Sequence, residues 1–579
     1  MTTKNLLNFT LAASATALLV GCDGLGKMIK KQNQITYDCK PNPLEMQGDT
    51  VMFTASAKYP AKVFAKKATV TVTPVIKYSN GGEKALKPIV LVGDKATGSG
   101  QKIAYDKGGS FSYTSEKIAY EDGMKNSILE LRAQGAVKSK TKDFTPVKIA
   151  DGTIITSLLV RNDEKGIYAK DAFVKTQPAN QSASIYYLIN KSDVRSTEMK
   201  SEEVKNLQSF ISANVSNPFY EFKDIGVSAY SSPDGEQSLN ANLAQERAKS
   251  GSKALMAEFN KNKNKDQKFG KEESYYKTQT TAEDWDGFKQ LMEQSSIADK
   301  DLILRVLTMY NDGEQREKEI KNLSKTYTEV ADKILPKLRR SVLTVNADKK
   351  SRTDEMLIKM SSTNPDSLSI EELLYAATLT NDVNKKAQIY KSAEQKYPND
   401  WRASNNYGVA LLAQNKVDEA KQAFARAEKN ANNNPILMNH LGIIEAKNGN
   451  RVKAMEFYGK AGSASEVSYN KGIINVRDGQ YSEAVSNFGS SKDFNKALAE
   501  LLSGNKGAVA STLDGSSDKE NALSYYLLAI SAARGSNTAD VIKNLKTAIE
   551  KDGSLKAMAK DDAEFVKLRD NADFKGLVS

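Results

Sequence analysis

Histidine and cysteine are nearly absent from this sequence of 579 residues, which contains one histidine, His440, and two cysteines, Cys22 and Cys39. Ser-His-Asp and Cys-His catalysis, HExxH zinc sites and cysteine-rich metal sites all require more of these residues than the chain has. We therefore expect no enzyme activity, no metal site and no cofactor. His440 lies two residues before Gly442 in a helical stretch, and we interpret it as a packed or exposed helix residue.

Long apolar runs are absent as well. Beyond the N-terminal run no stretch of about 18 apolar residues occurs, so the sequence predicts no membrane-spanning helix. The 83 basic and 71 acidic residues give a net charge of +12, which could suit nucleic acid, an anionic membrane or an acidic polymer. The lysines come in small groups without a nucleic-acid motif. We interpret the excess as a solvated basic surface and expect no nucleic-acid partner.

The first 22 residues have the pattern of a bacterial lipoprotein signal. An apolar run, Leu11–Val20, is too short to span a bilayer. It ends in Leu-Val-Gly-Cys, which matches the lipobox, in which a peptidase cuts before a lipidated cysteine; the alternative is a chance cysteine. The match predicts a signal peptide at 1–21, a lipid on Cys22 and a polar tether at 22–45. With Cys22 lipidated, Cys39 has no partner, and we expect no disulfide.

Residues 46–182 alternate with a period of two rather than 3.6. Apolar positions and turn residues predict strands separated by turns such as Asn80-Gly81-Gly82. The β-rich runs lie at Val51–Ala55, Ala68–Ile76, Lys87–Val92 and Ile154–Val160. We predict a β-sandwich-like region, as one domain or two small ones, that acts as a spacer or a docking surface.

Residues 183–348 predict a central α+β domain. A strand, a helix with Val204, Leu207 and Ile211 on one stripe, a second strand and a second helix occur in this order. The helix start N-x-x-L-x-x-x-R-A at Asn240–Ala248 and the final R-R-x-V strand at Leu338–Val345 complete the pattern. The segment resembles the peptidoglycan-binding domain of the OmpA family, with a helical insertion before the last strand.

The resemblance implies a binding site for the charged end of diaminopimelate in the wall peptide. Arg247 keeps the family's arginine, whose guanidinium would clamp a carboxylate. Ser231-Ser232 replaces the family's T-D pair, so the ammonium loses its expected partner unless Asp234 supplies one. The peptidoglycan-binding candidates are Arg247, Asp234, Ser232 and Asn240. The alternative is a domain kept as a scaffold, with an altered ligand or none.

Residues 369–579, after a polar linker at 349–368, repeat with nearly the tetratricopeptide period. The set Gly408, Ala420, Phe424 and Ala427 recurs 34 positions later, and again 30 positions further on. Glycine and alanine suit positions where helices touch, and an aromatic ring fills the groove between them. We predict an all-α tetratricopeptide solenoid of five or six repeats, with a concave face that binds peptides or proteins.

Three asparagines, Asn405, Asn439 and Asn470, occupy equivalent places one helical face away from the packing positions. We predict that they project toward the concave groove, where their amides can bond an extended peptide backbone. They are the partner-binding candidates. The alternative is that they are polar residues on a solvated helix face.

The order of these segments resembles outer-membrane lipoproteins of Bacteroidota that combine an OmpA-like domain with tetratricopeptide repeats. The resemblance implies a lipid-anchored adaptor on the periplasmic face of the outer membrane. It would dock on the cell wall and present its repeats to an outer-membrane assembly or secretion complex. A second hypothesis is a passive strut that links outer membrane and peptidoglycan. A wall-modifying enzyme would need paired carboxylates, and no spacing distinguishes any from surface charge.

Overall fold

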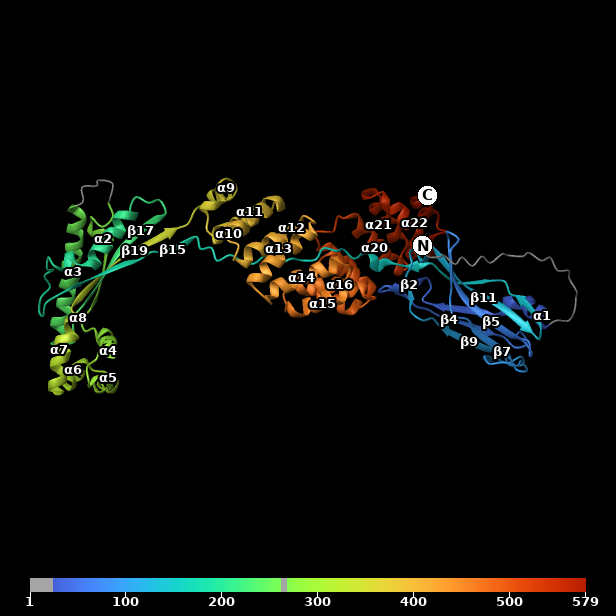
Figure 1. The fold of residues 1–579 in the computed structure, drawn as a ribbon, viewed down its shortest axis with the longest axis horizontal. Helices are drawn as coiled ribbons and strands as arrows, with labels where there is room; N and C mark the ends of the chain where they lie inside the picture. Colours follow the sequence, from blue (N-terminus) through green and yellow to red (C-terminus); the bar gives the residue numbers. More distant parts are fainter. Residues whose placement is uncertain (1–23, 262–267) are drawn as a thin grey trace, which may run out of the picture. The chain divides into compact units, whose positions relative to one another are not determined.

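The computed structural model describes residues 24–261 and 268–579, so the predicted signal peptide and Cys22 lie outside the described residues. The chain forms two compact units (Figure 1). The first contains the chain up to Ala169 together with Pro398–Ser579, and the second is Lys170–Tyr397. The N-terminal sheets and the C-terminal helices thus share one unit, although more than 200 residues separate them in the sequence.

The N-terminal part of the first unit is rich in β-structure, as predicted. Three sheets have the strand orders β1-β4-β9, β10-β3-β2-β14 and β12-β11-β5-β7-β8, with β13 paired to β11 and β6 paired to β5. Alternate residues of the strands enter a common apolar core. The strands are β1 Thr36–Lys40, β2 Leu44–Gln47, β3 Thr50–Val51, β4 Thr54–Tyr59, β5 Thr69–Tyr78, β6 Glu83–Ala85, β7 Ile89–Gly93, β8 Gln101–Ile103, β9 Gly109–Thr114, β10 Ile118–Ala119, β11 Ser127–Val137, β12 Lys140–Asp143, β13 Val147–Asp151 and β14 Thr153–Ile154, with a 3-10 turn, η2, at Asp122–Met124.

Both predicted limits of this region need correction. The segment 22–45 is not a tether from residue 24 onward, because helix α1 Gly24–Lys30 buries Leu25 and Met28 in the sheet core. The expected strand Ile154–Val160 is wrong as well. Strand β14 ends at Ile154, a 3-10 turn, η3, follows at Thr156–Leu159, and no helix or strand occurs between it and Thr176.

The C-terminal part of the first unit is a solenoid of paired helices, which confirms the predicted repeats. The helices are α12 Trp401–Ala413, α13 Val417–Asn430, α14 Pro435–Lys447, α15 Arg451–Lys460, α16 Ser465–Arg477, α17 Tyr481–Phe488, α18 Phe494–Leu502, α19 Lys506–Asp514, α20 Ala522–Arg534, α21 Thr538–Lys551, α22 Ser554–Asp561 and α23 Ala572–Val578, with a 3-10 segment, η7, at Ala563–Leu568. The first helix of each of the three best-matched pairs carries the repeated glycine, and the second carries the aromatic residue.

The predicted close approach of the repeated glycines is confirmed. A Cβ atom added to Gly408 would lie 2.5 Å from the Phe424 ring. The equivalent distances are 2.4 Å from Gly442 to Tyr458 and 2.7 Å from Gly472 to Phe488. These separations are shorter than any ordinary carbon contact, so a larger residue would force the two helices of a pair apart.

Polar contacts join the sheets to the repeats within the first unit. The Gln47 amide donates to the carbonyl of Gly479 at 3.2 Å. Arg534 of α20 forms ion pairs with Glu45 of β2 at 3.2 Å and with the buried carboxylate of Glu564 at 2.6 Å. These contacts join the two parts directly. The β-rich region is therefore packed on the repeats and is not a separate spacer.

The second unit contains the predicted strand, helix, strand and helix. Its sheet has the order β15-β19-β17-β18, with β16 also paired to β19. Strands β17 and β18 are parallel and the other pairs are antiparallel. The elements are β15 Thr176–Pro178, β16 Gln181–Tyr186, α2 Glu202–Asn214, β17 Tyr220–Tyr230, α3 Gln237–Lys261, β18 Tyr276–Thr281 and β19 Arg340–Lys350. The helical insertion forms α4 Trp285–Gln294, α5 Lys300–Met309, α6 Gly313–Asn322, α7 Ser324–Lys333 and α8 Leu335–Leu338.

The second unit ends in helices where the sequence predicted a linker. Strand β19 continues to Lys350, and helix α9 Asp354–Thr363 occupies half of the segment 349–368 that was expected to be a polar linker. The predicted capping box that opens the next helix is present, because Ser369 and Glu372 each bond the other's backbone N–H. Helices α10 Ile370–Thr378 and α11 Val383–Lys396 belong to this unit and not to the one that holds α12 to α23.

Candidate peptide-binding groove

An extended segment of the chain itself, residues 160–169, occupies the groove of the repeats. It follows η3 and runs along the first helices of four successive pairs, α12, α14, α16 and α18 (Figure 1). These helices lie 237 to 334 residues further along the chain than the segment that they contact. The groove predicted for a partner therefore holds a ligand already, and the ligand is the chain that leaves the sheet domain.

The groove holds this segment by its main chain. Alternate residues turn their N–H and C=O groups toward the helices, where asparagine amides accept from the one and donate to the other. Asn495 bonds Arg161 at 2.8 and 3.1 Å, Asn470 bonds Lys165 at 2.7 and 3.0 Å, Asn439 donates to the Lys165 carbonyl at 3.0 Å, Asn405 donates to the Ile167 carbonyl at 3.2 Å and Asn406 bonds Ala169 at 2.7 and 3.0 Å. The backbone of an extended peptide has no partners of its own, and this ladder supplies them.

The three asparagines predicted to line the groove do line it. Asn405, Asn439 and Asn470 are each 0% exposed, so the alternative of a solvated helix face is wrong. Sequence reasoning missed two further members, Asn406 and Asn495. The spacing of 25 residues between Asn470 and Asn495 departs from the repeat period, and only the short helix pair α16 and α17 with its turn brings the two amides into one row.

His440 is a member of the same row. Its Nε2 accepts a hydrogen bond from the Ile167 N–H at 2.8 Å, and its ring stacks on Phe424 with centroids 4.5 Å apart. Of the two expected environments, packed or exposed, the structure shows the packed one, with this added contact to the segment. Complete burial lowers the pKa of His440 to about 3. The imidazole is therefore neutral at pH 7, as an acceptor at Nε2 must be.

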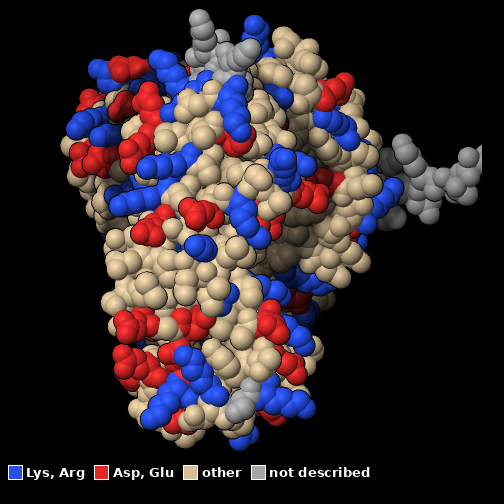
Figure 2. Space-filling model, turned by 90° about the vertical axis from the view of Figure 1, so that its left-hand side faces the viewer, with Lys and Arg blue, Asp and Glu red and all other residues tan. Residues whose placement is uncertain are grey.

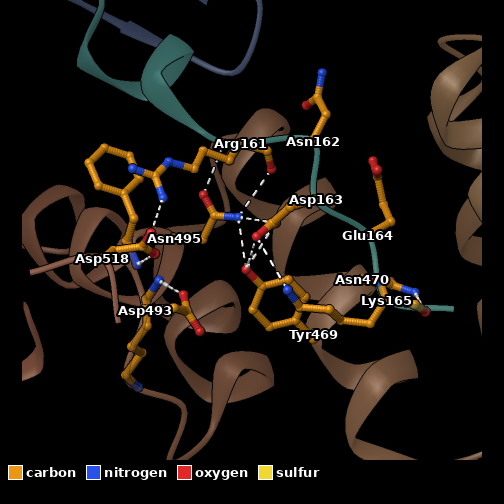
Figure 3. A network of polar contacts seen from close by, with 12 residues as sticks. Arg161, Asn162, Asp163, Glu164, Lys165, Tyr469, Asn470, Asp493, Asn495 and Asp518 are labelled. Atoms are coloured by element: carbon orange, nitrogen blue, oxygen red, sulfur yellow. Dashed lines mark hydrogen bonds and ion pairs between the residues drawn. The ribbon is translucent and has the colours of Figure 1, made fainter. Parts of the chain in front are cut away.

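Side chains of the segment also contact the groove (Figure 3). The Arg161 guanidinium lies over the Phe494 ring at 4.3 Å and pairs with Asp518 at 2.7 Å. The Asp163 carboxylate accepts from the Tyr469 hydroxyl at 3.0 Å and from the Asn495 amide at 2.9 Å. Burial, and then the neighbouring Asp163 carboxylate, raise the pKa of the Tyr469 hydroxyl, which keeps it a donor.

Two residues in the middle of the segment pack closely against the helices. The Glu164 side chain is 1% exposed and pairs with Lys447 at 3.0 Å. Two residues later, a Cβ atom added to Gly166 would lie 2.9 Å from a methyl carbon of Val409 and 3.6 Å from His440 Nε2. The helices therefore approach the main chain of residue 166 too closely to leave room for a side chain.

The predicted wall-binding residues lie together in the second unit, but their groups point into the protein. Arg247 is 1% exposed, and burial lowers the pKa of its guanidinium to about 10. It donates to the carbonyls of Lys191 and Tyr230 and to the Ser231 hydroxyl at 3.0 to 3.1 Å. Within residues 24–261 and 268–579, no carboxylate forms an ion pair with it. Main-chain oxygen atoms therefore accept the N–H groups with which Arg247 was expected to clamp a ligand carboxylate.

The other three candidates have internal partners as well. Arg339 bonds both Ser232, at 3.0 Å, and Asp234, at 3.1 Å. The Asn240 amide donates to the Gly235 carbonyl at 3.4 Å. Asp234 thus pairs with an arginine of the same unit, whereas the resemblance implied that it could take the ammonium of the wall peptide. The helical insertion also reaches this turn, because the Glu317 carboxylate of α6 accepts from the Gly235 N–H at 2.6 Å.

The exposed charges form no large patch of one sign on the face shown in Figure 2, where basic and acidic side chains alternate. Among the described residues no group of three or more histidine, cysteine or acidic side chains is placed to hold a metal ion. Over the same part of the chain, no helix is both long and apolar enough to cross a bilayer. Cys39 is a buried free thiol.

No family model matches the sequence, and no curated protein matches it. Solved structures that match part of this chain include the APC/C hetero-tetramer Cut9-Hcn1, at 11% identity over 39% of this chain, with a TM-score of 0.29. This chain spans 45% of that structure's length. Others are PilW, a widely conserved type IV pilus biogenesis factor (13% identity, 40% of this chain, 100% of that one, TM-score 0.26), and YrrB, a TPR protein with an unusual peptide-binding site (18%, 35%, 94%, 0.20).

Proposed function

We propose that this protein is a non-enzymatic scaffold of the bacterial envelope, anchored by a lipid on Cys22 at the periplasmic face of the outer membrane. Its repeats hold the segment that leaves the sheet domain, and its surfaces bind an outer-membrane assembly or secretion complex. The observation that carries the proposal is the row of asparagines and His440 along residues 161–169. Such a row binds backbone and performs no chemistry on it.

The filled groove changes how such an adaptor would work. An open groove could bind a partner's peptide directly, whereas this groove already fixes the chain's own connection between its sheets and its second unit. Because nine hydrogen bonds at about 0.5 to 1.5 kcal/mol each would have to be exchanged, partners are expected on other surfaces unless they compete for the groove. The passive strut remains the alternative.

Crosslinking on membranes followed by affinity capture tests the proposal. The intact protein should capture a reproducible set of outer-membrane proteins. Cys22→Ser should leave the membrane fraction after a high-salt wash and lose that set, because the acyl chains supply the anchor. Capture of cell-wall material without any protein would favour the strut. A Cys22→Ser protein that stays in the membrane would contradict lipid anchoring.

Wall docking is a second candidate, favoured by a guanidinium that is buried at Arg247 without a carboxylate partner among the described residues. A wall-peptide carboxylate would have to displace the carbonyls that Arg247 now contacts. Sedimentation with purified sacculi tests this candidate. Binding by the parent that is lost in Arg247→Lys, which keeps the charge and loses the planar fork, would support it, provided that circular dichroism shows the variant to be folded. No sedimentation of the folded parent would make the domain a scaffold.

A further inference from the structure

The asparagine row explains how the groove holds a peptide but not why it holds this one. Amides that bond main-chain N–H and C=O groups treat every sequence alike. Any extended stretch of the chain could satisfy them. The same stretch could also do so after a shift along the groove by two residues, because alternate residues face the helices. The segment nevertheless sits in one register, with Lys165 at Asn470 and Ala169 at Asn406. Side chains at fixed positions must select that register.

Gly166 is the first selecting position. The Val409 methyl carbon lies 2.9 Å from where its Cβ would be, and Val409 is itself 5% exposed and β-branched. Neither side can move without repacking the helices of two repeats. A slip by two residues in either direction would keep the backbone hydrogen bonds but bring Glu164 or Tyr168 to this position, and neither side chain fits there.

Charges select the residues before the glycine. Arg161 needs both the Phe494 ring and the Asp518 carboxylate, and Glu164 is enclosed beside Lys447. Asp163 lies between them, on the Tyr469 hydroxyl and the Asn495 amide (Figure 3). The groove therefore presents the Asp518 carboxylate to the arginine, the Tyr469 and Asn495 donors to the aspartate and the Lys447 ammonium to the glutamate of an Arg-x-Asp-Glu sequence. A reversed or neutral sequence would leave Asp518 and Lys447 without their partners.

We propose that the groove is a sequence-selective peptide receptor. Its ligand class is an extended segment with arginine, then Asp-Glu at the second and third positions after it, and glycine at the fifth. The chain fills the receptor with its own residues 161–169, and a partner protein with the same pattern is the class of ligand that can replace them. This biological setting rests on the proposed scaffold function, whereas the selectivity does not.

The test uses the full-length protein with residues 161–169 replaced by a Gly-Ser sequence of equal length, and a fluorescent peptide that corresponds to residues 159–171. The emptied protein should bind the peptide, and the parent should not, because its own segment is present at high effective concentration. Peptides with Arg161→Ala, Asp163→Ala, Glu164→Gln or Gly166→Val should each bind at least about 10-fold more weakly. Asn162→Ala, at an exposed position, is the matched control and should bind normally.

Equal binding of the native and a scrambled peptide would overturn the proposal, because the asparagine row would then act alone. Failure of a folded, emptied protein to bind the native peptide would also overturn it. If emptying the groove prevents folding, hydrogen exchange on Gly166→Val decides the question. The amides of Lys165, Ile167 and Ala169 should lose protection while the helices keep theirs, and retained protection would contradict the proposal. Crosslinked partners of the parent are scored separately, so loss of selectivity and loss of scaffold function remain distinguishable.

Discussion

The groove of the repeats and the surroundings of Arg247 in the second unit both satisfy hydrogen-bonding groups inside the protein, but with the roles of side chain and main chain exchanged. In the groove, side chains on rigid helices satisfy the main chain of a distant segment. Around Arg247, main-chain carbonyls of neighbouring strands and turns satisfy one side chain. The hydrogen bonds in the groove can be broken by detaching the segment, because water then solvates its main chain. Those around the arginine cannot, because its side chain lies inside the fold, where the Ser231 hydroxyl and the part-buried carbonyls of Lys191 and Tyr230 lose their donor when the guanidinium is removed. Hence substitutions in the groove should release a peptide, whereas substitution of Arg247 should unfold a domain.

Arg247→Ala should have the largest effect. It removes the donor to the buried Ser231 hydroxyl and to two part-buried carbonyls, at about 1 to 3 kcal/mol for each group that stays without a partner. We expect the second unit to lose roughly 3 kcal/mol or more in chemical denaturation. The exposed Arg305→Ala is the control and should change stability by less than about 0.5 kcal/mol. A loss of unfolding free energy below about 1 kcal/mol would show that Arg247 does not hold the second unit together.

Acid should release the segment through His440. The folded-state pKa of about 3 lies below the ordinary value of 6.5, so the stabilisation is fully present above pH 6.5 and is lost as the pH falls toward 3. The free energy of the segment's attachment should fall by about 1.4 kcal/mol per pH unit in that window. Hydrogen exchange at Ile167 between pH 6.5 and 4.5, corrected for intrinsic rates, measures it. In His440→Gln, which cannot titrate, the same pH change should have little effect at this amide.

Asn470→Ala should loosen the segment at its centre. The variant removes both hydrogen bonds to Lys165 and the bond to Asn439, and we expect a loss of roughly 2 to 3 kcal/mol in local opening free energy. Proteolysis within residues 160–169 should accelerate while the helices remain intact. This differs from the expectation for an empty groove, in which substituting these asparagines would leave the melting temperature nearly unchanged. An unaltered cleavage rate would show that Asn470 does not hold the segment.

Ala420→Leu should have the smallest effect on stability of the four substitutions or conditions. It should destabilise the segment 160–169 and the helices to the same extent. Ala420 is 0% exposed in the pair formed by α12 and α13, and overpacking typically costs about 1 to 3 kcal/mol. The first unit should melt at a lower temperature, with the segment and the helices losing protection together. Lys421→Leu, at the exposed neighbouring position, is the control. Selective release of the segment by Ala420→Leu would show that helix packing and groove occupancy are coupled more tightly than expected.

Local patterns in the sequence predicted the repeats and much of the groove. The glycine and aromatic positions recur because two helices of a pair can touch only there, and Asn405, Asn439 and Asn470 recur with them. The capping box at Ser369 was predictable for the same reason, since its two hydrogen bonds join residues three positions apart. Asn495 was not, because its place in the row depends on the shortened pair before it.

The sequence by itself determined which stretches form strands, which form paired helices, and which side chains line the concave face. Only the tertiary structure decided what occupies that face. Residues 160–169 have no helix or strand pattern of their own, and the asparagine and histidine side chains that bond their backbone lie more than 230 residues away. The tertiary structure also decided that Arg247 faces carbonyls and that Asp234 pairs with Arg339. A sequence motif records which residue types are present, whereas hydrogen-bond partners depend on which groups the folded chain brings within about 3 Å.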